Sequence, residues 1–317
     1  MLAACGIAYA VIAATLPRAQ LFVTWDSLEP DKWASIWLIK QHIDPDAVVE
    51  VRATGDPVSD GIPFGVPEAV YKRTGSRSAF ESLLLGFAQT DPTLQAMGRI
   101  ITTIETTAWN APSDPLVHVV ERNFRQLQDR YGRAYVPISC YAHFFDVLYA
   151  QLAMAAPPDI LGQSLSLAVD NQSCAQAPTM AERTGALRVK EMAIENLLTE
   201  IALNKSVVFV DTREPAEFQR SHIPGAINIP MRSLNEKVYR QLRQADLVIS
   251  YCVKDFRGYE VARQMLDNGL NNVAVMKPHG LSGWQSSGLP ITSLDLPEKA
   301  ALEKLMHCAK GQQECLK

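Results

Sequence analysis

The sequence predicts an α/β protein: a mostly helical N-terminal domain precedes a C-terminal parallel sheet with helices on both faces. Residues 25–155 place apolar side chains at helical spacing in several successive segments. Residues 156–187 are rich in Ser, Gln, Ala and Pro and show weak periodicity. From residue 188, short apolar runs alternate with helical segments, a pattern typical of parallel strands joined by crossover helices.

The length and composition are those of a globular protein with two domains. The chain has 317 residues, of which 47% are apolar, so each domain can bury a core. The formal net charge is -4, which argues against nucleic acid as a partner. Composition leaves the oligomeric state open.

The first segment, residues 1–20, begins with sixteen residues that carry no charge. This apolar run is short for a membrane span but suits the apolar region of a signal peptide, although no Lys or Arg precedes it. Two localisations stay open. The segment is either a signal or membrane anchor of an exported protein, or a buried N-terminal element of a cytoplasmic one.

The N-terminal domain is expected at residues 21–155. An Asp-Pro pair ends its first helix at Asp44, and Gly132 follows a helix that begins near Asp114. The predicted helices are residues 34–43, 79–87, 94–109, 114–132 and 141–154, with one strand near residues 48–53. Residues 156–187 are interpreted as a linker.

The C-terminal domain is expected at residues 188–293, followed by a polar, amphipathic and helical tail at residues 294–317. The predicted strands are residues 206–211, 246–252 and 272–277. The predicted helices are residues 192–202, 233–244 and 258–270, and residues 280–291 are interpreted as a closing loop.

Six scattered cysteines contain no Cys-x-x-Cys pair, which argues against a zinc ribbon or a thioredoxin-like motif. One disulfide, for instance Cys140 with Cys174, stays open. His42, His118 and His143 lack metal-ligand spacing, so no metal site is predicted.

The segment YCVKDFRG places Cys252 at the carboxyl end of a predicted strand and just before a helix. Ligands bind at this edge of open α/β sheets, where loop amides and the helix dipole favour an anion. We therefore expect a lowered pKa for the Cys252 thiol, which makes it a nucleophile. Lys254 and Arg257 are the expected donors to an oxyanion group.

The length of this loop bears on the chemistry. Four residues separate Cys252 from Arg257, and the small ring of amides suits one sulfur atom on the cysteine better than a phosphate. The remaining residues expected to line the substrate site are Val253, Asp255, Phe256 and Gly258. The Asp255 carboxylate would oppose an anionic donor unless it points outward.

Residues 207–292 resemble a rhodanese (sulfurtransferase) domain. The resemblance rests on four motifs in order: VVFVDTREPAEF, SHIPGAINIP, CVKDFRG and GLSGWQSSGLPI. It implies that Cys252 takes sulfur from a small anionic donor such as thiosulfate as a persulfide. A thiol or cyanide then accepts the sulfur, without a metal or organic cofactor.

Three further residues carry supporting roles under this resemblance. Asp211 is expected to tie down the loop or nearby backbone. Arg213 either lines the pocket entrance or forms a surface ion pair, and His222 packs and hydrogen-bonds within the fold.

Residues 23–152 resemble the chromate resistance protein family. The stretches are TWDSLEPDKWASIWLIKQHIDPDAVVEV, SAFESLLLGF and FFDVLYAQL. The resemblance implies a link to oxyanion stress. Asp31, Lys32, Ser35 and Trp37 either line a pocket or cap and pack the first helix.

Two alternatives to sulfur transfer stay open. One is a phosphatase or arsenate-reductase-like enzyme on the same fold, against which the short loop argues. The other is a sensing or binding module in which Cys252 detects oxidants or oxyanions.

Overall fold

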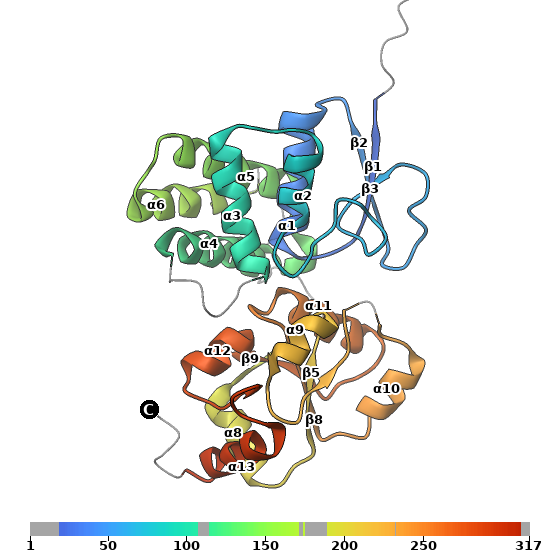
Figure 1. The fold of residues 1–317 in the computed structure, drawn as a ribbon, viewed down its shortest axis with the longest axis vertical. Helices are drawn as coiled ribbons and strands as arrows, with labels where there is room; N and C mark the ends of the chain where they lie inside the picture. Colours follow the sequence, from blue (N-terminus) through green and yellow to red (C-terminus); the bar gives the residue numbers. More distant parts are fainter. Residues whose placement is uncertain (1–18, 107–113, 171–173, 175–188, 232, 312–317) are drawn as a thin grey trace, which may run out of the picture.

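The computed structural model describes residues 19–106, 114–170, 174, 189–231 and 233–311, which form two domains (Figure 1). The interpretation of residues 1–18 as a signal or anchor lies outside these ranges. Among the described residues, no helix has the length and apolar character needed to cross a membrane.

The N-terminal domain packs helices beside a small parallel sheet of order β2-β1-β3. Its elements are β1 (Leu21–Trp25), α1 (Pro30–Leu38), the π-helix η1 (Ile39–Ile43), β2 (Val48–Arg52), β3 (Ile62–Pro63), α2 (Ala79–Gly86), α3 (Pro92–Thr106), α4 (Pro115–Tyr131), the 3-10 helix η2 (Arg133–Tyr135), α5 (Ile138–Ala153) and α6 (Pro158–Val169). The five predicted helices and the strand at β2 are present in the described residues, and residues 107–109 of the third predicted helix lie outside them. Strands β1 and β3 were not predicted; β3 has only two residues, and both are defined by pairing with distant residues.

Local side chains set the starts of two helices near the site. The Ser78 hydroxyl accepts the N–H of Glu81 at the start of α2, at 3.1 Å. The Asp114 carboxylate accepts the N–H of Leu116 at the start of α4, at 2.8 Å. Such caps satisfy amides that have no partner within the helix.

The linker interpretation of residues 156–187 is wrong for its first part, which forms α6. Leu161 and Leu165 are fully buried in the core of the N-terminal domain, where α6 packs on α4 and α5. The apolar residues on this one face stabilise the helix. A disulfide joins Cys140 at the start of α5 to Cys174.

The C-terminal domain is a five-stranded parallel sheet of order β4-β9-β8-β5-β7. Its elements are β4 (Lys190–Ala193), α8 (Ile194–Ala202), β5 (Val207–Asp211), α9 (Pro215–Arg220), β6 (Ser221–His222), β7 (Ile227–Asn228), α10 (Glu236–Leu242), β8 (Leu247–Tyr251), α11 (Phe256–Asp267), β9 (Val273–Lys277), α12 (Gly280–Ser286), β10 (Thr292–Ser293) and α13 (Glu298–Ala309). The short strands β6 and β10 pair separately.

Helices cover both faces of this sheet, as predicted. One core contains α8, α12 and α13, and the other contains α10 and α11. All five residues of β8 are buried, since β8 is the central strand between these layers. The α/β fold of the C-terminal domain is thereby confirmed.

Two segments of this domain differ from the prediction. Residues 190–193, predicted in part as helix, pair with β9 as edge strand β4. The predicted closing loop begins with helix α12, whose Trp284 is buried and donates its indole N–H to the carbonyl of Pro290 at 2.8 Å. Both differences arise from tertiary contacts that override weak local patterns.

Candidate active site

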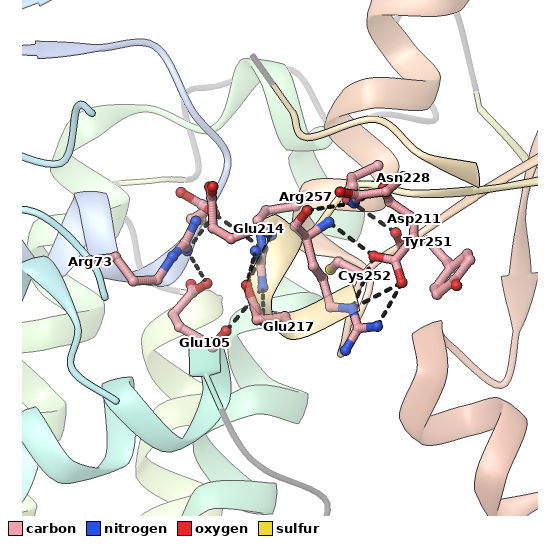
Figure 2. A network of polar contacts seen from close by, with 12 residues as sticks. Arg73, Glu105, Asp211, Glu214, Glu217, Asn228, Tyr251, Cys252 and Arg257 are labelled. Carbon is pink, nitrogen blue, oxygen red and sulfur yellow. Dashed lines mark hydrogen bonds and ion pairs between the residues drawn. The ribbon is translucent and has the colours of Figure 1, made fainter. Parts of the chain in front are cut away.

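Cys252 follows β8 at the carboxyl edge of the sheet and faces the N-terminal domain (Figure 2). The N–H of Asp255 donates to the Cys252 sulfur at 3.1 Å, and the N–H of Gly258 also hydrogen-bonds to it. Among the described residues, Cys252 is the free cysteine. The sulfur thus lies among main-chain donors and charged side chains, as the loop sequence predicts.

The expected lowering of the Cys252 pKa is wrong for this structure. Cys252 is 3% exposed, and its burial raises the pKa of the thiol above its usual value. The nearby Arg257 guanidinium and the two amides act in the opposite direction, while Asp255 adds to the rise. Desolvation outweighs the favourable contacts because a second domain covers the loop.

Helix α12 hydrogen-bonds to the backbone of the loop. The N–H of Leu281 donates to the carbonyl of Cys252 at 2.8 Å, and that of Ser282 donates to Val253 at 3.1 Å. Gly280 has a φ of 64°, and a β-carbon there would lie 2.4 Å from the carbonyl oxygen of Val253. The helix can approach this closely only with glycine at that position.

Arg257 is buried at 2% exposure and forms an ion pair with Glu217 of α9. Its two terminal nitrogens lie 3.0 and 3.2 Å from the two carboxylate oxygens of Glu217. Nη2 also donates to the main-chain carbonyl of Glu105 in α3, at 3.3 Å. The guanidinium therefore has protein partners on both domains, and donor binding by Arg257 stays a prediction.

The middle of the loop contacts α4 of the N-terminal domain. The ammonium of Lys254 pairs with Glu121 at 3.2 Å, so this predicted donor also has a partner. Phe256 packs edge-on against Phe124, with ring centroids 5.8 Å apart, and belongs to the core of the N-terminal domain. The loop thus joins the two domains.

Asp211 and Arg213 are both buried and pair with each other, at 2.6 Å between Nη2 and Oδ2. Arg213 also donates to the carbonyl of Ser221, so it is not a surface ion pair. His222 hydrogen-bonds to the Phe218 carbonyl and to Glu298. These contacts assign His222 a structural role, since they join α9 to α13.

A cavity of about 410 Å³ lies between the domains and reaches the loop at Arg257. Both domains contribute charged side chains to its lining: Glu29, Asp31, Lys32, Lys72, Arg73, Glu214, Glu217 and Arg257. Asp31 also accepts the amides of Ala79 and Phe80 at the start of α2, at 2.7 and 2.9 Å. Asp31 therefore lines the cavity, and it caps α2 instead of the first helix, for which capping was expected. No cluster of His, Cys, Asp or Glu suited to a metal ion occurs in the described part of the chain.

Buried acids at the interface predict a pH-dependent stability. Burial raises the pKa of Glu105 to about 8 and that of Glu260 to about 7. The folded state therefore binds more protons than the unfolded state, and stability is expected to fall as pH rises from about 4.5 to about 8, by about 1.4 kcal/mol per pH unit for each proton. Denaturant unfolding across this range checks the slope.

Glu260→Gln supplies the comparison for this pH dependence. Glu260 accepts the N–H of Leu28 at 3.0 Å, and a glutamine oxygen can replace that acceptor without titrating. The variant is expected to show a shallower slope than the wild type. An unchanged slope would contradict the assignment of a raised pKa to Glu260.

The sequence did not indicate which residues of the N-terminal domain contact the loop that follows Cys252. Glu121, Arg125 and Arg133 contact the loop from more than a hundred residues away. Arg125 and Arg133 belong to none of the motifs in the sequence, and no local signal marks them. Glu217 stands within a quoted motif, but its pairing with Arg257 required the fold.

Two family models match the chain. The model described as "ChrB, C-terminal domain" matches residues 22–152, and the model described as "Rhodanese-like domain" matches residues 195–287. The first range falls within the N-terminal domain and the second within the C-terminal domain.

Curated relatives match the C-terminal part. A sulfurtransferase of Allochromatium vinosum is 30% identical over 105 residues, which are 33% of this chain and 96% of that protein. A thiosulfate:glutathione sulfurtransferase of Saccharomyces cerevisiae is 32% identical over 95 residues, covering 26% of this chain and 68% of that protein. This chain spans about half the length of two further relatives, 51% and 52%.

Among solved structures, a thiosulfate sulfurtransferase of Pseudomonas aeruginosa is 22% identical, with a TM-score of 0.30. The match covers 33% of this chain and 20% of that one. The Rhodanese-like model matches the C-terminal domain, and this domain covers nearly all of the Allochromatium vinosum sulfurtransferase. The chain therefore belongs to the rhodanese-like sulfurtransferase family through its C-terminal domain, and it carries a ChrB C-terminal domain ahead of it.

Proposed function

We propose that the protein transfers sulfur through a persulfide on Cys252. The observation that carries the proposal is the position of the Cys252 sulfur, which accepts the N–H groups of Asp255 and Gly258 at the carboxyl edge of a parallel sheet. Main-chain donors in this arrangement stabilise negative charge on the sulfur without a proton transfer. The Cys252 sulfur carries such a charge when it attacks as a thiolate and again when it leaves as one.

The reaction consists of two displacements. The Cys252 thiolate attacks the outer sulfur of the donor, a new S–S bond forms, and the donor's S–S bond breaks. With thiosulfate as donor, sulfite leaves with the bonding electron pair. An acceptor thiolate then attacks the outer persulfide sulfur, and Cys252 leaves as the thiolate.

We propose thiosulfate as the donor class and a low-molecular-weight thiol such as glutathione as the acceptor. The name of the yeast relative includes both molecules. The interdomain cavity provides an approach to the loop at Arg257, and its lining contains both basic and acidic side chains.

The ChrB C-terminal domain supports a second part of the proposal, a link between sulfur transfer and chromate stress. If chromate acts on this protein, its addition is expected to change the rate of sulfur uptake at Cys252. Sulfate, an oxyanion of similar shape and charge, is the comparison.

Intact-protein mass spectrometry tests the sulfur-transfer proposal. After incubation with thiosulfate, the wild type is expected to gain the mass of one sulfur atom, and cyanide is expected to remove it. Cys252→Ser is expected to gain nothing, because the hydroxyl is a far weaker nucleophile towards sulfur than a thiolate.

The mass measurement and a phosphatase assay distinguish sulfur transfer from the sensor and phosphatase alternatives. A mass gain of two oxygen atoms that cyanide does not reverse indicates oxidation to the sulfinic acid and favours a sensor. Hydrolysis of an aryl phosphate that depends on Cys252 favours the phosphatase alternative. A wild type that takes no sulfur from thiosulfate or another sulfane donor contradicts the proposal.

A further inference from the structure

We propose that Arg125 and Arg133 of the N-terminal domain are positioning residues for the sulfur-transfer loop. They hold the Asp255 side chain, and thereby keep the loop amides directed at the Cys252 sulfur. The inference rests on the proposed function of Cys252, and it extends the site across both domains.

Asp255 has a backbone conformation that non-glycine residues rarely adopt. Its φ is 100° and its ψ is -21°, in the left-handed region where the β-carbon crowds the backbone. This conformation directs the N–H of Asp255 to the Cys252 sulfur at 3.1 Å. A strained residue of this kind persists only where its surroundings determine it.

Arginines of the N-terminal domain provide those surroundings. The Asp255 carboxylate is 1% exposed, and its Oδ2 lies 3.1 Å from Nη1 of Arg133 and 3.3 Å from Nη1 of Arg125. Nη2 of Arg125 also donates to the carbonyl of Lys254, the preceding residue. Both the side chain and the backbone of the strained turn are therefore held.

The two guanidinium groups are themselves kept in place. That of Arg125 lies over the ring of Phe256 at 4.3 Å and pairs with Glu121 at 3.1 Å. That of Arg133 lies over the ring of Tyr259 at 3.8 Å. Since Phe256 and Tyr259 belong to α11, each arginine contacts both the loop and the helix that follows it.

Charge supports the same assignment. The Asp255 carboxylate opposes both a thiolate on Cys252 and an anionic donor, and His279 is a third group that faces it, at 3.9 Å. The buried Arg133 and the partly buried Arg125 offset that charge at short range. Loss of either arginine thus weakens the loop through geometry and through charge.

Alkylation of Cys252 by iodoacetamide in the full-length chain tests the inference. The rate is measured against pH and assigned to Cys252 by peptide mass. For Arg133→Met we expect the apparent pKa of Cys252 to rise by about one unit and the rate near neutral pH to fall about tenfold. Sulfur uptake from thiosulfate is expected to slow by a similar factor.

The Asp255→Gly background separates positioning from a general loss of folding. Glycine adopts the left-handed conformation without strain and carries no carboxylate to be held. In that background, Arg133→Met is expected to change the alkylation rate by less than about twofold. An equal loss in both backgrounds overturns the inference.

Arg122→Met is the matched control, because Arg122 is an exposed arginine on α4, the helix that also carries Arg125. It is expected to leave the alkylation profile unchanged. An unchanged or faster rate in Arg133→Met overturns the inference, since the contact would then be neutral or would restrain the loop.

A second comparison covers the case in which Arg133→Met does not fold. Asp255→Ala keeps the β-carbon and loses the carboxylate, so it is expected to alkylate about tenfold more slowly than Asp255→Gly. Equal rates overturn the inference. Because alkylation needs no sulfur donor, it remains informative even if the wild type takes no sulfur from thiosulfate.

Discussion

Arg257→Met is expected to lower the free energy of unfolding by about 3–5 kcal/mol, the range for removing one partner of a buried ion pair. The substitution leaves the Glu217 carboxylate without the guanidinium that binds both of its oxygens. Glu29 lies 3.9 Å from Nε of Arg257 and loses a favourable charge, and the Glu105 carbonyl loses a donor. Urea unfolding followed by circular dichroism measures the change.

Two variants control this prediction. Arg243→Met removes an exposed arginine that pairs with Glu236 at 3.1 Å, and it is expected to cost less than about 1 kcal/mol. Adding Glu217→Leu to Arg257→Met is expected to recover much of the loss, because no unpaired carboxylate remains at that pair. If Arg257→Met and the wild type have the same midpoint of urea unfolding, the ion pair contributes nothing to stability.

Gly280→Ala is expected to lower the free energy of unfolding by about 2–5 kcal/mol and to abolish most sulfur uptake. The estimate combines about 1–2 kcal/mol for an L-residue in the left-handed region with about 1–3 kcal/mol for overpacking. The new β-carbon would lie 2.4 Å from the Val253 oxygen and 2.8 Å from the Cys252 oxygen. Both are backbone atoms of the loop that follows β8, so the loop itself must move.

Gly269→Ala is the matched control for this substitution. Gly269 has a φ of 79°, but no heavy atom lies within 4 Å of the position of an added β-carbon. Only the conformational cost of about 1–2 kcal/mol is expected, with sulfur uptake retained. Equal losses of sulfur uptake in the two variants would show that contact with the loop is not the cause.

Much of the C-terminal domain was predictable because its signals are local. The apolar runs at β5, β8 and β9 are short and bounded by turn residues, and such runs are typical of buried parallel strands. Once β8 is placed, Cys252 must stand at the carboxyl edge of the sheet. The following helix must then begin at the loop, where its first amides lack partners within the helix.

Other features were not predictable because they depend on neighbours distant in sequence. The Ser-, Gln-, Ala- and Pro-rich composition and weak periodicity of residues 156–187 indicated a linker, yet the buried Leu161 and Leu165 pack α6 into the helical core. The Cys252 pKa was expected to be low from the loop alone, and the covering domain reverses that direction by desolvation.

By itself, the sequence determined most helices of the N-terminal domain, the strands β5, β8 and β9, the position of Cys252 at a strand end, and the likeness of both domains to known families. Only the tertiary structure decided which charges meet. It pairs Arg257 with Glu217, and it brings Arg125 and Arg133 to Asp255 across a domain interface. The reason is physical: periodicity and turn residues act between near neighbours along the chain, whereas burial and charge act through space and are set when distant segments pack.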